Sequence, residues 1–232
     1  MTEESELVTI DPNGDMLIIL KDPNTALLEW KEDKDLLEET IAQAAAEATE
    51  TVNDSEVAPL ERELPKTRYL VSSRQMRIVS PYFENMFKFN YGETVSVFED
   101  DLYHVQAQGW NPEAFAVVLN VAHVQLQAIP KKVSLASFAW LYVIADYYQM
   151  EGVLGLFTTE WLNQLKRQPM PITYSKELVL WMFLSVKLQD METFNHMALI
   201  ATRKACYPIQ FLDLPFPPGG QGKLSICFVR AC

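Results

Sequence analysis

The sequence predicts an α+β fold in which a small sheet is covered by a cluster of short helices and followed by a helical extension. Three observations support this prediction. Residues 68–87 encode a strand and two capped helices within twenty residues. Residues 16–20 form an apolar run, and residues 104–109 alternate in polarity, as strands do. Several segments after residue 111 carry apolar residues at helical spacing.

The first strand is expected at Asp15–Leu20, and the second at Tyr69–Val71. Ser72 followed by Gln75 has the spacing of a capping box, in which each residue satisfies a backbone N–H of the other. Ser80-Pro81 then ends one short helix and starts the next, because proline disfavours helical geometry in the residue before it and suits the first helical position itself. The second helix has a broad apolar face, formed by Tyr82, Phe83, Met86 and Phe87.

Residues 94–98 and 104–109 are predicted to be sheet, with Val105 and Ala107 on one face and His104, Gln106 and Gln108 on the other. Asn111-Pro112 should start a helix over residues 113–125. A second helix should begin near Ser134 and run through Tyr148, and a third should span residues 156–166 after a break flanked by Gly152 and Gly155. Two more are expected, one capped by Ser175 and ending at Leu188, the other over residues 191–204.

The segment around Ser80-Pro81 resembles the signature of the BTB (POZ) domain, in the form abundant in filamentous fungi. The residues that carry this resemblance are Leu70, Met76, Ile78, Ser80, Pro81, Tyr82, Phe83, Met86 and Phe87, supported by Asp15–Leu20 and Tyr103–Phe115. The resemblance covers residues 11–22 and 66–214. It departs from the family at Lys66, Thr67 and Arg68, where many members carry an Asp and a His.

The resemblance implies a BTB domain over residues 11–150, with an acidic, flexible insertion at 23–65, and a helical extension over 151–214. Residues 1–10 are expected to be a disordered terminus, and residues 215–232 an irregular tail. Within the insertion, residues 33–50 favour a helix with a thin apolar stripe. The insertion is interpreted as a solvated excursion, and the alternative is an acidic docking segment.

The implied function is protein–protein interaction, with no catalysis. BTB domains commonly form two-fold homodimers through the first strand and first helix, positions that are occupied here by Met16, Leu17, Ile18, Met76 and Ile78. An exposed apolar strand invites aggregation unless something covers it, and a symmetric partner would do so. The alternative is that residues 16–20 form an internal strand of the monomer's own sheet.

Two roles for such a module are considered. As a substrate adaptor for a cullin-type ubiquitin ligase, the chain would contact the cullin through Tyr91 and Glu93, which have the order and spacing of a family motif around Gly92. A plain turn at Gly92 is the competing interpretation. The alternative role is that of an oligomerising scaffold or a transcription-linked cofactor that binds no cullin.

Charge and cysteine content exclude several other classes. Of the net charge of −12, most lies in residues 22–63, which carry thirteen acids and three bases, whereas residues 64–232 carry thirteen acids and fifteen bases. No basic surface for nucleic acid is expected. Three cysteines without a close pair predict neither a disulfide framework nor a zinc site. The N-terminus lacks an apolar signal-peptide stretch and no run is long enough to span a membrane, so an intracellular protein, cytoplasmic or nuclear, is expected.

No constellation for catalysis, cofactors or metals is predicted. His104, His123 and His196 fall on separate elements without a carboxylate at ligand spacing, and His123 is interpreted as a hydrogen-bonded histidine at the edge of the core. The run Gly219–Lys223 lacks the hydroxyl residue and the preceding strand of a phosphate-binding loop. The tryptophans and methionines of the helices are interpreted as core; they are Trp140, Trp161, Trp181, Met182 and Met197.

Overall fold

The computed structural model describes residues 6–24, 30, 67–89, 100–205 and 209–216. They belong to two units, one made of residues 1–27 and 63–170 and the other of residues 28–62 and 171–232. The described residues contain four strands and seven helices, which confirms the predicted α+β class. The boundary at residue 170 differs from the expected division near residue 150. The predicted strand at 94–98, the insertion helix at 33–50 and the tail beyond residue 216 lie outside the described residues.

The first unit contains one four-stranded sheet with the order β1-β3-β2-β4. Its strands are β1 (Leu7–Thr9), β2 (Met16–Lys21), β3 (Thr67–Val71) and β4 (Tyr103–Gln108). Strand β2 runs antiparallel to β3 and parallel to β4, and β1 runs parallel to β3. The expectation of a disordered terminus over residues 1–10 is therefore wrong for β1. The predicted first strand is an interior strand of the sheet.

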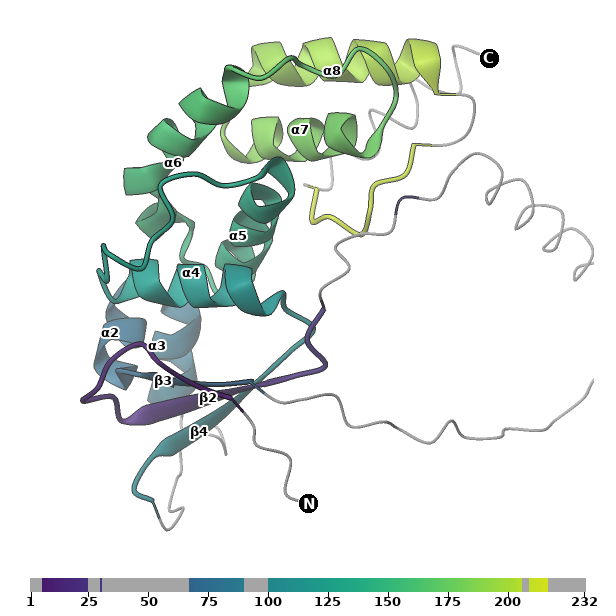
Figure 1. Ribbon diagram of the computed structural model, residues 1–232. Helices are drawn as coiled ribbons and strands as arrows, with labels where there is room; N and C mark the ends of the chain where they lie inside the picture. Colours follow the sequence, from purple (N-terminus) through teal and green to yellow (C-terminus); the bar gives the residue numbers. More distant parts are fainter. Residues whose placement is uncertain (1–5, 25–29, 31–66, 90–99, 206–208, 217–232) are drawn as a thin grey trace, which may run out of the picture. The chain divides into compact units, whose positions relative to one another are not determined.

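The strand faces follow from the sequence pattern. Val105 and Ala107 of β4 are buried, while Gln106 and Gln108 are exposed, as their alternation predicts. Most of β2 is buried, since both its edges are paired and α2, α3 and α4 lie on one side of the sheet (Figure 1). The core of this unit therefore forms between that side of the sheet and the helices.

Helices α2 (Ser73–Val79) and α3 (Pro81–Lys88) begin directly after the predicted caps, Ser72 and Ser80. The Ser72 hydroxyl accepts a hydrogen bond from the Gln75 backbone N–H at 3.3 Å, and the Ser80 hydroxyl accepts one from Phe83 N–H at 3.3 Å. The other hydrogen bond of the predicted capping box, between the Gln75 side chain and Ser72 N–H, does not form. The Gln75 side chain donates to the Ala122 carbonyl instead, and Ser72 N–H donates to His123 Nε2.

The other helices of the first unit are α4 (Pro112–Ala122), α5 (Leu135–Tyr147) and α6 (Glu151–Lys166). The Asn111 side chain caps α4 as predicted, and α5 begins where expected, with the Ser134 side chain as its cap. Helix α5 is buried on nearly every side. The predicted break at Gly152 and Gly155 is wrong, because α6 passes through both glycines without interruption.

In the second unit, α7 (Lys176–Lys187) and α8 (Met191–Lys204) form a helical hairpin. Ser175 caps α7, and Asp190 caps α8 through a bond from Thr193 N–H at 3.1 Å. The predicted core residues Trp181, Met182 and Met197 are buried. Among the described residues, no helix is both long and apolar enough to cross a membrane.

Candidate interaction surface

Three aromatic side chains from distant parts of the first unit meet at its surface. Tyr82 lies in the first turn of α3, Trp110 follows β4, and Tyr147 is the last residue of α5. The Tyr147 ring centroid lies 5.6 Å from that of Tyr82 and 5.1 Å from that of Trp110. We call these three residues the aromatic surface.

A buried layer fixes the aromatic surface from below. The Ser80 hydroxyl, which is fully buried, donates to the Tyr148 backbone carbonyl, so the start of α3 is tied to the end of α5. The Tyr148 hydroxyl accepts a hydrogen bond from Trp110 Nε1 at 3.0 Å, and its ring stacks on Phe83 at 5.3 Å. The rings of the aromatic surface therefore lie next to side chains that the interior of the unit already holds in position.

All three rings keep part of their surface exposed. Tyr147 leaves 53% of its surface accessible, and Tyr82 and Trp110 are half-buried. Large aromatic side chains on a rigid base are the residues that contribute most to protein–protein binding, because they bury much apolar area and lose little conformational freedom. Tyrosine also keeps a hydroxyl that can hydrogen-bond to a partner.

An ion pair lies on the neighbouring helices α2 and α3. Arg77 Nε donates to Glu84 Oε2 at 2.8 Å, and the Arg77 guanidinium also lies 5.5 Å from the centre of the Phe87 ring. The hydrogen bond from Arg77, together with its positive charge, lowers the pKa of the Glu84 carboxyl. Both side chains are nearly half exposed, so the pair orients side chains more than it stabilises the fold.

The five residues expected to form a dimer interface differ in how much of their surface is exposed. Met16, Leu17 and Ile18 are buried within a single chain, where β2 is an interior strand, and Met76 is a buried residue of α2. Ile78 alone keeps an exposed side chain, with 69% of its surface accessible. A dimer contact through the other four would require these buried side chains to become exposed. Tyr91 and Glu93, the expected cullin contacts, lie outside the described residues.

The histidines hold structural hydrogen bonds. His123 Nε2 accepts from Ser72 N–H at 3.0 Å, and Nδ1 donates to the Leu119 carbonyl at 2.9 Å, so both ring nitrogens are hydrogen-bonded within the protein. This confirms the interpretation of His123 as a hydrogen-bonded histidine. His104 differs from expectation, since its Nε2 lies 2.9 Å from Asp100 Oδ2. Within the described ranges, no three His, Cys, Asp or Glu side chains gather where they could hold a metal ion.

Sequence reasoning missed Trp110 and Tyr147 as surface residues, and it placed Tyr82 in the signature and on the apolar face of its helix, where the structure leaves it half-buried. The pair Tyr147-Tyr148 was the available signal, because adjacent tyrosines at a helix end place one ring inside and leave the next outside. Comparison with models of known protein families, and with curated proteins, finds no match to this chain.

Proposed function

We propose that this chain acts by binding other proteins, and that the aromatic surface is its main contact area. The observation that carries the proposal is Tyr147, which stays half exposed between two other rings on a base of buried hydrogen bonds. A surface that is ordered before binding avoids much of the entropic cost of association. Exposing a tyrosine in this way has no evident benefit for the isolated fold.

The resemblance to BTB domains supports an interaction role and suggests self-association as well. It rests on the strand, short helix and Ser80-Pro81 pattern, and the structure has a strand and two short capped helices at those residues. Within the family's dimer positions, the exposed Ile78 is the residue through which we propose that two copies meet. A homodimer would then leave the buried core of β2 intact.

For the client of such a module we retain two proposals. In the first, the chain is a cullin adaptor, and Tyr91 and Glu93 contact the cullin. In the second, it is a scaffold that binds no cullin. Titration of purified chain against a cullin N-terminal region distinguishes them: the adaptor proposal expects saturable binding that the double variant Tyr91→Ala, Glu93→Ala abolishes. If the wild type does not bind the cullin region, the adaptor proposal is excluded and the scaffold proposal remains.

The interaction proposal is tested by quantitative affinity capture from the native cell, using the wild type and Tyr147→Ala. Removal of a central aromatic residue should reduce recovery of the main partner by about tenfold or more. Leu156→Ala is the matched control, because Leu156 is 83% exposed on α6 but stands outside the aromatic surface. Equal recovery by Tyr147→Ala would exclude the aromatic surface, and failure of the wild type to retain any partner would contradict the interaction role.

A further inference from the structure

The three rings of the aromatic surface all contact one buried ring at steep angles. The buried ring is Tyr148, which is 4% exposed and stacks on Phe83. The centroids of Tyr82, Trp110 and Tyr147 lie 5.3, 6.0 and 4.9 Å from its own, at interplanar angles of 90°, 61° and 81°. Three π systems therefore converge on one small area, and each keeps part of its surface exposed.

This arrangement of rings is suited to a positively charged group. The face of an aromatic ring attracts a cation that lies within about 6 Å of the ring centre, and tryptophan does so most strongly. The centroid of Tyr147 lies 5.6 Å from that of Tyr82 and 5.1 Å from that of Trp110. A cation resting on the aromatic surface can therefore lie within this range of more than one ring.

The chain around these rings carries little positive charge. Residues 89–165 hold eight Asp or Glu and only two Lys or Arg, which are Lys131 and Lys132. Both lysines precede α5, whereas Tyr147 is its last residue, and a helix of 13 residues is about 20 Å long. This length is about twice the Debye length at 0.1 M salt, so the two lysines are screened from the aromatic surface.

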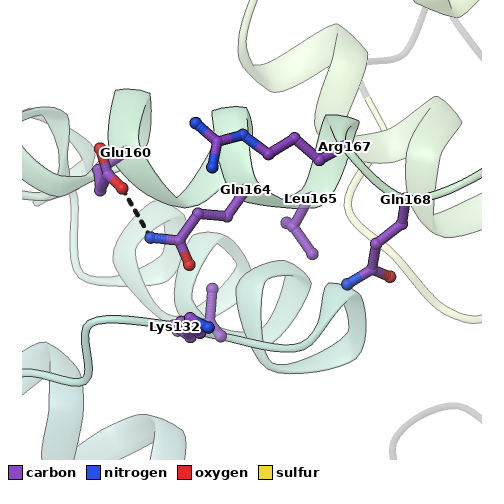
Figure 2. A pocket seen from close by; sticks show the side chains of 7 residues that line it. Lys132, Glu160, Gln164, Leu165, Arg167 and Gln168 are labelled. Carbon is purple, nitrogen blue, oxygen red and sulfur yellow. Dashed lines mark hydrogen bonds between the residues drawn. The ribbon is translucent and has the colours of Figure 1, made fainter.

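Lys132 also belongs to a different part of the unit. A cavity of about 270 Å³ lies between the loop that precedes α5 and the last turns of α6, and Figure 2 shows Lys132 on the loop and Arg167 on the helix among its lining side chains. Gln164 Nε2 donates to the Lys131 carbonyl at 3.0 Å, which ties the loop to α6. The cavity shares no residue with the aromatic surface.

The basic residues nearest to Tyr82 and Trp110 in the fold are paired or point to other elements. Arg77 and Lys88 flank Tyr82 in the chain. Arg77 is ion-paired with a carboxylate of α3 at 2.8 Å, and Lys88 lies in the last turn of α3, whereas Tyr82 lies in the first. Lys21, at the end of β2, donates from Nζ to a glutamine of β4 at 3.0 Å.

Two carboxylates adjoin the aromatic surface in the chain. Asp146 directly precedes Tyr147, and Glu113 lies in the first turn of α4, three residues after Trp110. Glu113 is exposed, and Asp146 is half-buried. A partner that combines an aromatic contact with attraction to carboxylates is best supplied by arginine, because its planar guanidinium stacks on ring faces and also pairs with carboxylates.

We propose that the aromatic surface receives an arginine side chain of the protein partner. The guanidinium would lie over the Tyr147 ring, and the negative charges of Asp146 and Glu113 would attract it. The inference rests on the proposed function, because it names the chemistry of the group that the interaction surface binds. A lysine and a neutral side chain are the alternatives that the test separates.

The test uses the full chain and a blocked peptide of alternating Gly and Arg that carries a neutral fluorophore, followed by fluorescence anisotropy at low salt. A second peptide has lysine in place of arginine, and a third has citrulline, its neutral isostere. We expect the arginine peptide to bind with a dissociation constant below about 1 mM. The lysine peptide should bind about threefold or more weakly, and the citrulline peptide about tenfold or more weakly.

Variants at the surface locate the contact. Tyr147→Leu keeps an apolar side chain but removes the ring, so it should weaken binding of the arginine peptide about threefold or more, whereas Tyr147→Phe should stay within about twofold of the wild type. Asp146→Asn should weaken binding about twofold or more. Asp101→Asn is the matched control and should bind like the wild type, because Asp101 is an exposed carboxylate before β4 and asparagine tolerates its positive φ of 57°.

Several results would overturn the proposal. Equal weakening by Asp146→Asn and Asp101→Asn would mean general attraction to an acidic protein. Equal binding of the lysine or the citrulline peptide would exclude recognition of the guanidinium, and full binding by Tyr147→Leu would exclude the ring. Failure of the wild type to bind the arginine peptide would also reject the inference. The proposed function is judged separately: if Tyr147→Ala still reduces recovery of the partner, the aromatic surface binds that partner through other chemistry.

Discussion

Two side chains far from α2 in sequence complete its N-terminus. Asp15 Oδ1 accepts from Ser73 N–H and Oδ2 accepts from the Ser73 hydroxyl, both at 2.7 Å, and His123 accepts from Ser72 N–H. Local spacing predicted the Ser72 cap, but it could not predict these partners, because sequence patterns report neighbours three or four residues away. The same limit applies to Trp110, whose partner Tyr148 lies 38 residues later, just after α5.

A first prediction at the residue scale concerns Glu84. Its hydrogen bond from Arg77 lowers its pKa, so an NMR pH titration of the Glu84 carboxyl should give a midpoint below that of an ordinary glutamate, about 4.3. Because the pKa is lower in the folded state, the stabilisation is present above the ordinary value and is lost as the pH falls through the folded pKa. Arg77→Gln should return the midpoint toward the ordinary value. An unchanged midpoint in Arg77→Gln would show that the pair does not persist in solution.

A second prediction at the residue scale concerns Phe83, which is 1% exposed and packs against the rings of Tyr82 and Tyr148. Phe83→Ala should lower the free energy of unfolding by about 3–5 kcal/mol, as large aromatic truncations in cores do. Phe89→Ala is the matched control, because Phe89 is 64% exposed and should cost less than about 1 kcal/mol. Urea denaturation measures the loss of unfolding free energy in each of the two variants. Similar losses in the two variants would contradict the packing of α3.

At the scale of elements, helix starts were the most predictable feature of the chain. The side chains of Ser72, Ser80, Asn111 and Ser175 cap α2, α3, α4 and α7 as predicted, and α5 begins near Ser134 as predicted, since each start depends on residues adjacent in sequence. Strand β1 escaped prediction because it has only three residues and gains its order by pairing with β3, sixty residues later. Helix α6 was shortened in the prediction because glycine disfavours helix locally, while burial of Leu154 and Trp161 holds the helix in place.

Gly155 leads to a prediction for α6, with Gly14 as a contrasting position. A methyl group added at Gly155 would meet no atom within 4 Å, so Gly155→Ala should raise the free energy of unfolding by about 0.5–1 kcal/mol through better helix propensity. Gly14→Ala should have the opposite sign, because its Cβ would lie 2.6 Å from the Val71 carbonyl oxygen. Thermal and urea denaturation of the two variants would measure these opposite changes in the free energy of unfolding. A destabilised Gly155→Ala would mean that α6 is not continuous there.

At the scale of the whole molecule, the sequence predicted the class of fold but not the surfaces. Apolar periodicity distinguishes buried from exposed positions within one element, and it correctly placed Phe83 and Trp161 inside. The aromatic surface combines residues 82, 110 and 147, and the cavity combines a loop with a helix thirty residues later. Neither leaves a pattern in any one segment, so both become visible only when the elements are assembled.

The last prediction concerns self-association. If two copies meet through Ile78, sedimentation equilibrium of the wild type should show a dimer, and Ile78→Lys should shift it to monomer, because a lysine charge in an apolar contact must be desolvated without a partner. The fold should survive, since Ile78 is 69% exposed. Val124→Lys supplies the control, as Val124 is a comparable apolar residue, 61% exposed, elsewhere in the same unit. If the wild type stays monomeric at high concentration, or if Ile78→Lys still forms a dimer, the proposed contact through Ile78 is excluded. The aromatic surface would remain available to other proteins.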